Sequence, residues 1–189
     1  NAIYKDSEGF VWLGTDNCLD RFDGVKVRHY EFRGVDSGRK KRVNCITETA
    51  DNQLWVGNGI GLWRLNRANG QLERIVPEKI DFAVNTLLPD GDILYIGTEK
   101  GLFIQKDGQL LQVLTDRNML AACNRIMDLC LNEDKSALWL ATVQGLFSYS
   151  LKDGKIDSWH FQENVPEADY FRCLTRIGET LYLGTMSQG

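Results

Sequence analysis

Titratable side chains are plentiful in this chain, but few have the spacing that chemistry requires. The two histidines, His29 and His160, each stand beside aromatic residues in strand-like runs, a setting more typical of sheet residues than of a general acid or base. Most carboxylates fall in turn-like segments, where they accept turn hydrogen bonds. A lyase or glycosidase needs two carboxylates held at a set separation across a cleft, and the sequence indicates no such pair.

Nucleophile and metal motifs are also missing from the sequence. It contains no phosphate loop, dinucleotide fingerprint, HExxH or GxSxG. The five cysteines form no CxxC pair, and they are Cys18, Cys45, Cys123, Cys130 and Cys173. We expect them to be small buried hydrophobic residues, with one periplasmic disulfide as the open alternative. The sequence therefore predicts no catalytic residue, no metal site and no cofactor.

The composition is that of an ordinary folded domain. The chain has 189 residues, of which 43% are hydrophobic, and a formal net charge of −4. This slight acidity argues against nucleic acid as a partner. The sequence contains no apolar run long enough for a membrane helix and no recognisable signal peptide. Asn1 and Ala2 are interpreted as a remnant of a purification tag.

A repeated segment explains how the chain positions its side chains. The segment "DSEGFVWLGT" at residues 6–15 recurs in altered form four more times. Its aromatic residue recurs about every 40–44 residues, which is a period typical of propeller blades or helical arrays. The five copies of this aromatic are Trp12, Trp55, Tyr95, Trp139 and Tyr182.

The content of one period distinguishes strands from helices. Residues 44–76 hold four short runs rich in β-branched and aromatic residues, without a 3.6-residue periodicity. Between the third and fourth runs of the blades stand Asn-Gly or Asp-Gly pairs, which supply the positive φ angles of tight hairpins. These pairs are Asp23-Gly24, Asn69-Gly70, Asp107-Gly108 and Asp153-Gly154. Each period is thus predicted to be a four-stranded antiparallel meander, with the repeated aromatic between neighbouring sheets.

The predicted fold is an all-β propeller fragment of about four and a half four-stranded blades. It would belong to a larger ring of six to eight blades, with seven favoured. The predicted blades are residues 1–43, 44–82, 83–121, 122–165 and the partial blade 166–189. All belong to one propeller domain. Unpaired strand edges invite pairing with a second copy, so we expect a homodimer through exposed blade edges.

The repeat resembles the two-component regulator propeller repeat, D-x-x-G-x-x-W-[LV]-G-T-x-x-G-L-x-R. Copies such as "DSEGFVWLGT" and "DNQLWVGNGIGLWR" carry this resemblance over essentially the whole chain. Three positions depart from it. Cys18 replaces a turn glycine, Ala141 replaces the strand glycine, and Asn58 replaces the threonine found as Thr15, Thr98, Thr142 and Thr185. These departures leave the shape of the turns open but not the fold.

The resemblance implies a sensor function. Such propellers form extracytoplasmic, periplasmic sensor regions of hybrid two-component regulators, which report carbohydrate breakdown products through a membrane helix to a histidine kinase. By this resemblance the chain is the N-terminal part of a sensor and not itself an enzyme. Its partners would be an oligosaccharide and the remaining blades and domains of the parent protein. It would bind no nucleic acid and holds no membrane segment.

The topology of a propeller narrows the search for a binding surface. The turn between the second and third strands and the connection between blades lie at one mouth of the central channel. Polar residues that begin the innermost strands are candidates for binding hydroxyl-rich or anionic sugars. They are Arg42, Asn44, Asn85, Asn124, Arg125, Tyr170 and Arg172. The alternative is that they are solvated loop residues.

Two further features allow competing interpretations. The basic run at residues 39–42 could clamp an anionic sugar, but a flexible charged loop is the favoured interpretation. The connector 162–171 could cover the same mouth. Trp63 and Trp159 lie outside the repeated aromatic position, and packing is favoured over an exposed sugar platform.

Three functions are therefore compared. The favoured one is a ligand-binding sensor module. The second is a scaffold for protein–protein interaction with no small ligand, and the third is a propeller polysaccharide lyase. A rise in melting temperature with an oligosaccharide separates the first two, and turnover of a uronate substrate identifies the third.

Overall fold

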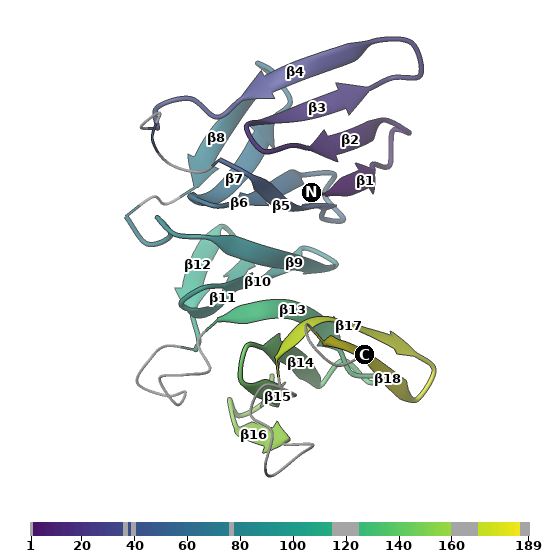
Figure 1. The fold of residues 1–189 in the computed structure, drawn as a ribbon, viewed down its shortest axis with the longest axis vertical. Helices are drawn as coiled ribbons and strands as arrows, with labels where there is room; N and C mark the ends of the chain where they lie inside the picture. The colour runs from purple at the N-terminus through teal and green to yellow at the C-terminus, as the bar shows by residue number, and fades with distance from the viewer. Residues whose placement is uncertain are drawn as a thin grey trace. The chain divides into compact units, whose positions relative to one another are not determined.

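Four-stranded and two-stranded β-sheets account for the regular structure of the chain. A computed structural model describes residues 2–35, 38, 41–75, 78–114, 125–159 and 170–185. In these residues, strands adjacent in sequence are adjacent in space, and they form four sheets of four strands and one sheet of two (Figure 1). This all-β meander architecture confirms the predicted propeller-fragment fold.

Each sheet corresponds to one blade of the repeat. Blade one holds β1 (Ile3–Lys5), β2 (Val11–Gly14), β3 (Cys18–Phe22) and β4 (Val27–Glu31). Blade two holds β5 (Val43–Glu48), β6 (Leu54–Asn58), β7 (Gly61–Asn66) and β8 (Gln71–Ile75). Blade three holds β9 (Val84–Asp90), β10 (Ile93–Thr98), β11 (Gly101–Lys106) and β12 (Gln109–Gln112). Blade four holds β13 (Ile126–Leu131), β14 (Ala137–Thr142), β15 (Gly145–Ser150) and β16 (Ile156–Trp159). Blade five holds β17 (Phe171–Ile177) and β18 (Thr180–Thr185).

The chain forms two compact units. Unit 1 comprises residues 1–96 and 105–109, and unit 2 comprises residues 97–104 and 110–189. Unit 1 therefore contains blades one and two together with β9, and unit 2 contains blades four and five. The other strands of blade three contribute residues to both units. Each unit is described below by itself.

The hairpins between third and fourth strands have the backbone that their sequence requires. Gly24, Gly70, Gly108 and Gly154 have φ angles of 97°, 67°, 73° and 72°. These left-handed values favour glycine because it lacks a Cβ. Each glycine lies between the third and fourth strands of its blade, so the predicted Asn-Gly and Asp-Gly hairpins are confirmed.

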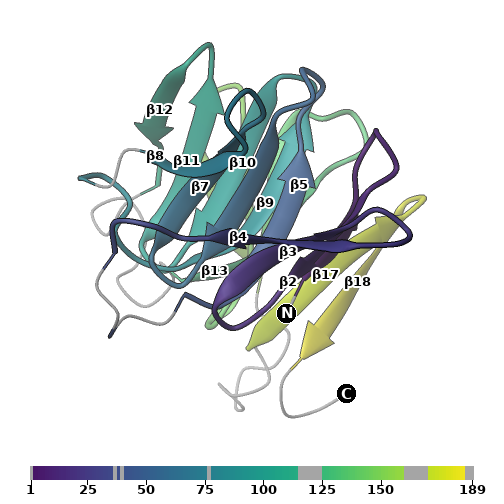
Figure 2. The same ribbon diagram turned by 90° about the horizontal axis from the view of Figure 1, so that it is seen from above.

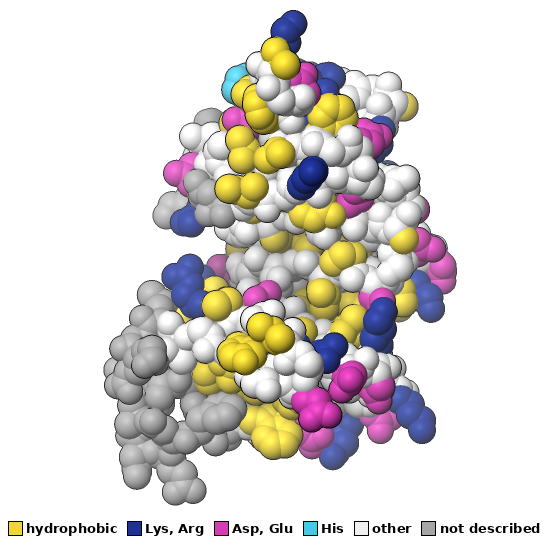
Figure 3. Space-filling model, turned by 90° about the vertical axis from the view of Figure 1, so that its right-hand side faces the viewer, with side chains coloured by type: hydrophobic (Ala, Val, Ile, Leu, Met, Phe, Trp, Pro, Cys, Tyr) yellow, Lys and Arg dark blue, Asp and Glu magenta, His cyan; other side chains and the backbone are white. Residues whose placement is uncertain are grey.

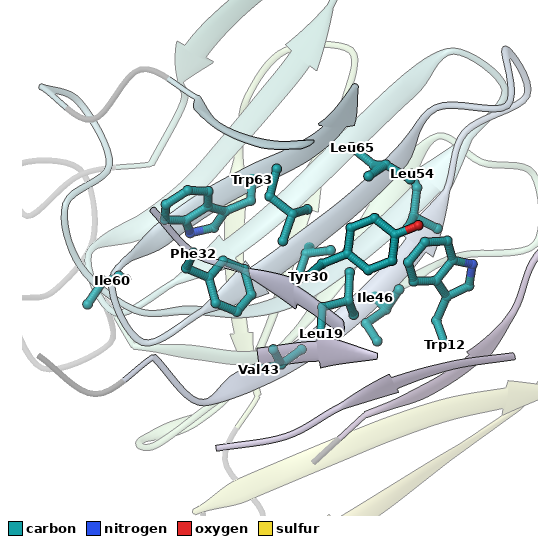
Figure 4. Packing of buried hydrophobic residues seen from close by; sticks show 12 residues of the cluster. Trp12, Leu19, Tyr30, Phe32, Val43, Ile46, Leu54, Ile60, Trp63 and Leu65 are labelled. Atoms are coloured by element: carbon teal, nitrogen blue, oxygen red, sulfur yellow. The ribbon is translucent and has the colours of Figure 1, made fainter. Parts of the chain in front are cut away.

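The core of unit 1 lies between blades one and two. Trp12 and Tyr30 pack with ring centroids 5.3 Å apart, and Phe32 meets Trp63 edge-on at 5.0 Å. Figure 4 shows these rings with the aliphatic side chains that surround them, among them Leu19 and others from both blades. Aromatic pairs of this kind contribute about 0.5–1.5 kcal/mol beyond the burial of their area. Trp63 is a core residue, as the favoured interpretation predicted.

Trp12 and Trp55, two of the three repeated tryptophans, have partners for their indole N–H groups. The Nε1 of Trp12 donates to Asp6 Oδ2 at 2.8 Å, and that of Trp55 donates to Thr49 Oγ1 at 3.2 Å. In each case the acceptor stands six residues before the tryptophan. A buried indole N–H without an acceptor would destabilise the fold. The acceptor six residues earlier therefore allows the tryptophan ring to be buried in the core.

A charged cluster joins the first two blades at the other end of the sheets. Arg67, in the turn after β7, lies 2.9 Å from Glu48 Oε1, 3.0 Å from Glu8 Oε2 and 3.9 Å from Asp6 Oδ2. The backbone N–H of Ser7 also donates to Glu48 Oε2 at 2.8 Å. The side chains of Asp6 and Glu48 are almost fully buried. Arg67 therefore compensates carboxylates that water reaches poorly.

In unit 2, blades four and five pack through their inner strands. Ala141, Leu146, Phe171 and Leu174 form a buried cluster. The backbone N–H of Leu174 donates to Asp128 Oδ2 at 3.0 Å, which joins β17 to β13. Figure 2 looks onto the antiparallel pair β17–β18. Tyr182, the aromatic of this copy, is 52% exposed.

The ends of the described segments add two observations. Ala2, interpreted from the sequence as a tag remnant, accepts a hydrogen bond from Gly14 N at 2.7 Å and packs against the core.

No helix in the described part of the chain has the length and apolar character to cross a bilayer.

Candidate functional site

The turn between the second and third strands is built around one side chain. Thr98 Oγ1 donates to Gly101 O at 2.8 Å and accepts from Lys100 N at 3.0 Å. Thr142 makes the same two bonds, to Gly145 O at 2.8 Å and from Gln144 N at 3.1 Å. A hydroxyl can donate and accept at once. The repeated threonine therefore closes the turn that lies at the same end of the sheets as the candidate binding residues.

Blade two keeps this turn with a different residue. Asn58 Oδ1 accepts from Ile60 N at 3.0 Å, which replaces the acceptor function of threonine. It also accepts from the indole of Trp63 at 3.1 Å. The other blades of the repeat have no indole to satisfy here, because Phe103 and Phe147 occupy the equivalent of Trp63. The departure at Asn58 thus changes the bonding of the turn and preserves the turn itself.

Three of the innermost strands, β5, β13 and β17, begin with a break in register. The pairing shifts between Val43 and Cys45, between Ile126 and Asp128, and between Phe171 and Cys173. The extra residues at these bulges are Asn44, Met127 and Arg172, and Asn85 has the equivalent sequence position in β9. Bulges re-aim side chains and occur often beside binding sites. Two of the seven predicted binding residues, Asn44 and Arg172, are thus bulge residues.

In unit 1, three predicted residues share one sheet end. We call the end of each sheet that carries its second turn and the start of its first strand the 2–3 edge. Asn44 Nδ2 donates to Val84 O at 2.9 Å, so Asn44 and Asn85 lie at the same end of neighbouring strands. Arg42 Nε lies 3.9 Å from Asp16 Oδ1. Arg42 is exposed and lies near the Asp16 carboxylate. The side-chain amide of Asn44 already donates one hydrogen bond to the Val84 carbonyl.

In unit 2, the 2–3 edge presents a less compensated arginine. Arg125 Nη2 lies 3.6 Å from Glu99 Oε1, in the same relation as Arg42 to Asp16. Arg172 stands at the bulge of the neighbouring strand β17 and is exposed. Within the described part of the chain, Arg172 has no hydrogen-bond or ion-pair partner. Tyr170, two residues before it, is half-buried. This edge therefore offers an exposed guanidinium two residues from a half-buried tyrosine.

Several predicted residues lie outside the described residues. These are Asn124, Arg39, Lys40, His160 and the connector 162–169. The remaining residues of the basic run, Lys41 and Arg42, are described.

The cysteines are less buried than predicted. Cys18, Cys45 and Cys130 are partly exposed and Cys173 is exposed. The expectation of small buried hydrophobic residues is therefore wrong for these four. Cys45 and Cys173 pair in register with the strand glycines Gly57 and Gly184 and fill the space above them. Cys123 lies outside the described residues.

Trp159 is both packed and partly exposed, so it agrees in part with each of the two interpretations, packing and an exposed sugar platform. Its ring is tilted against Trp139 with centroids 5.9 Å apart, yet 49% of the residue is exposed.

A polar cluster on blade one escaped the sequence-based reasoning. His29 Nδ1 lies 2.7 Å from Asp20 Oδ1, and the Cys18 thiol donates to Asp20 Oδ1 at 3.4 Å. His29 is thus a sheet residue, as predicted, but its partner is a carboxylate. The signal was present in the sequence, because the Asp23-Gly24 hairpin sets His29 opposite Asp20 and alternation puts Cys18 on the same face.

The opposite charges on the surface are interspersed. Figure 3 shows one face of the molecule, on which Lys and Arg side chains lie among Asp and Glu side chains. This face carries no basic stripe of the kind that binds a nucleic-acid backbone.

The fold and its repeated turns define a β-propeller built from blades of one sequence type. The family model for the two component regulator propeller matches residues 1–17. Comparison with curated protein sequences gives no match. The predicted resemblance to two-component regulator propellers is confirmed by the family match together with the structural comparisons that follow.

Solved structures share this fold over nearly the whole chain. The extracellular domain of the one component system BT4673 from B. thetaiotaomicron has a TM-score of 0.79 and 25% identity, covering 98% of this chain and 26% of that one. The extracellular domain of the hybrid two component system BT3049 from the same organism has a TM-score of 0.76 and 21% identity, covering 97% and 27%. A catalytically inactive virginiamycin B lyase from Staphylococcus aureus, with quinupristin, has a TM-score of 0.69 and 15% identity, covering 96% and 61%. The chain spans about a quarter of the two sensor domains.

Proposed function

We propose that the chain is part of a periplasmic sensor domain of a hybrid two-component regulator, which binds a carbohydrate and relays the signal to a histidine kinase. The repeat match at residues 1–17 and the likeness to extracellular domains of two-component systems support the sensor class. Because the chain covers about a quarter of those domains, the ligand, the kinase and the remaining blades are proposed partners.

The exposed guanidinium of Arg172 carries the ligand proposal. It stands at a bulge, next to Tyr170 and beside the strand that begins after Arg125. A planar guanidinium binds carboxylates and vicinal hydroxyls through paired N–H groups, and an aromatic ring stacks on a sugar face. Arg125 differs because Glu99 lies near it. An acidic oligosaccharide such as a uronate fits this edge best.

A thermal-shift experiment tests this function. The chain is melted with neutral and uronate-containing oligosaccharides. A ligand at 100 times its Kd stabilises the folded state by about 2.7 kcal/mol, so a bound uronate raises the melting temperature. Arg172→Ala abolishes this shift, whereas Lys106→Ala, at the opposite end of a sheet, preserves it. If no sugar shifts the melting temperature, or if Arg172→Ala leaves the shift intact, the proposed ligand site is wrong.

The two alternative functions give other outcomes in the same experiment. A lyase would consume the uronate and generate an unsaturated product, which absorbs in the ultraviolet. A protein-binding scaffold would show neither a shift nor turnover.

Association of two copies through sheet edges remains a proposal. Among the described residues, β18 is an edge strand of its sheet. Edge strands present unpaired N–H and C=O groups. Light scattering across a concentration series measures this directly: a dimer supports edge pairing, and a monomer at every concentration contradicts it.

A further inference from the structure

The polar cluster on blade one brings three metal-binding side chains together. Cys18 and Asp20 are two residues apart on β3 and point to one face, and His29 on β4 is the register partner of Asp20. Their ligand atoms, Sγ, a carboxylate oxygen and a ring nitrogen, lie within 4.8 Å of one another. The cluster belongs to the face opposite Leu19 and Tyr30, which pack against blade two.

Comparison of the blades shows that the other copies of the repeat carry different residues at the positions of Cys18 and Asp20. In blades two to four the equivalent of Cys18 is glycine, and the equivalent of Asp20 is aromatic. Those aromatics are fully or almost fully buried, and they are Trp63, Phe103 and Phe147. Blade one therefore replaces a packing residue with a carboxylate and, two positions earlier, a glycine with a thiol. Two departures on one face of β3, opposite a histidine on β4, indicate a shared function other than packing.

We propose that Cys18, Asp20 and His29 bind a divalent transition-metal ion, with Zn²⁺ as the best fit. Zn²⁺ is bound by thiolate, imidazole and carboxylate at about 2.0–2.3 Å, which places ligand atoms of a tetrahedral site roughly 3.3–3.7 Å apart. The Sγ–Oδ1 distance is already 3.4 Å, and the Nδ1–Oδ1 distance of 2.7 Å opens by a small rotation of an exposed imidazole. On binding, the thiol releases its proton to solvent and the thiolate becomes the ligand.

The surroundings complete the coordination and select the metal. A water takes the fourth position, and Glu31, the register partner of Cys18, adds a carboxylate on the neighbouring strand. Thr15 Oγ1 lies 3.2 Å from Cys18 Sγ and orients the sulfur. The His29 side chain is exposed, so an ion reaches the cluster from solvent. A sulfur ligand favours Zn²⁺ or Co²⁺ over Mg²⁺ and Ca²⁺, which prefer oxygen.

Cobalt spectroscopy tests the proposal on the 189-residue chain. Co²⁺ is titrated in, and we expect one equivalent to give intense visible bands of a tetrahedral site together with a thiolate charge-transfer band in the near ultraviolet. Zn²⁺ then displaces it and abolishes both signals. Cys18→Ser removes the charge-transfer band and weakens binding at least about tenfold, as does His29→Ala. The matched control is Cys173→Ser, at another free thiol, which leaves both signals unchanged.

The folded state of each variant is checked by circular dichroism, and Asp20→Asn provides a third variant that keeps the shape of the side chain. The absence of a charge-transfer band in the wild-type chain overturns the proposal. So does a Cys18→Ser variant that binds Co²⁺ with wild-type affinity and spectrum. Because metal binding is measured without sugar, this result is independent of the carbohydrate proposal.

Discussion

Val43 occupies the space that a side chain on Gly14 would need. A Cβ built on Gly14 would lie 2.5 Å from Cγ1 of Val43, and the two residues come from neighbouring blades. Val84 stands in the same relation to Gly57, with a distance of 2.6 Å. The glycine at or next to the end of the second strand is therefore in contact with the first residue of the next blade's first strand.

Gly14→Ala is expected to destabilise the chain. Overpacking in a fully buried contact costs about 1–3 kcal/mol, and this exceeds the gain of about 0.4–1 kcal/mol from a stiffer unfolded chain. Urea unfolding measures the free energy of unfolding. Val43→Gly in the same chain removes both Cγ1 and Cβ, which would lie 2.5 Å and 2.7 Å from the added methyl, so the double variant loses less than the sum of the two single variants. If the changes in the free energy of unfolding of the two single variants simply added in the double variant, the proposed contact between residues 14 and 43 would be contradicted.

Arg67→Ala is expected to cost more than a surface ion pair. It leaves the buried carboxylates of Asp6 and Glu48 without their cation. Loss of a fully buried partner costs about 3–5 kcal/mol, and because Arg67 is partly exposed we expect about 1–3 kcal/mol. Arg64→Ala is the control, because its pair with Glu73 is exposed and such pairs contribute about 0–1 kcal/mol. Equal effects of the two variants would show that the Arg67 cluster is unimportant.

Asn58 and Trp63 are expected to be energetically coupled. Asn58→Thr restores the common repeat residue but removes the acceptor of the Trp63 indole, and a buried donor without a partner costs about 1–3 kcal/mol. Trp63→Phe removes that donor. We therefore expect a double-mutant cycle to show that Asn58→Thr is much less damaging when residue 63 is phenylalanine. A coupling energy near zero in thermal or urea unfolding would refute this.

Turn aspartates in blade four are expected to make stability depend on pH. Hydrogen bonds from the Ser136 side chain and backbone lower the pKa of Asp134, and those from the Ser150 side chain and the Lys155 backbone lower the pKa of Asp153. A lowered folded-state pKa gives stability that is fully present above the unfolded value of about 4 and is lost as the pH falls through the folded-state pKa.

The melting temperature should therefore decrease as the pH is lowered below about 4. In the double variant Asp134→Asn and Asp153→Asn, the fall should be shallower, because asparagine keeps the turn and does not titrate. Asp107→Asn, in a comparable hairpin, serves as a control. If the melting temperature of the double variant fell with decreasing pH as steeply as that of the wild-type chain, the assignment to these two residues would be contradicted.

The sequence predicted the architecture because its strongest signals are local. The aromatic of each second strand and the Gly of each hairpin depend on alternation and backbone conformation, which act within a few residues. Trp12 and Gly24 could therefore be assigned without any knowledge of tertiary contacts. Asn58 could be identified as a departure, but its bond to Trp63 required the register of β6 and β7.

The candidate site was less predictable because charge compensation is a tertiary property. Arg42 and Arg125 were chosen for their position at the start of a strand, and only the fold shows that Asp16 and Glu99 lie near them. Cys18, Asp20 and His29 were judged one residue at a time. Their meaning depends on cross-strand pairing, which brings residues 9 apart in sequence into hydrogen-bond contact.

The bond between Asn58 and Trp63 also constrains how the blades can be exchanged during evolution. Tandem repeats invite unequal crossover, and a whole-blade copy from blade four would bring Thr142 and Phe147 together as a compatible set. A crossover between positions 58 and 63 would instead combine a threonine with an indole, or an asparagine with a phenylalanine. We therefore expect recombination breakpoints between the blades of this chain to avoid the interval 58–63.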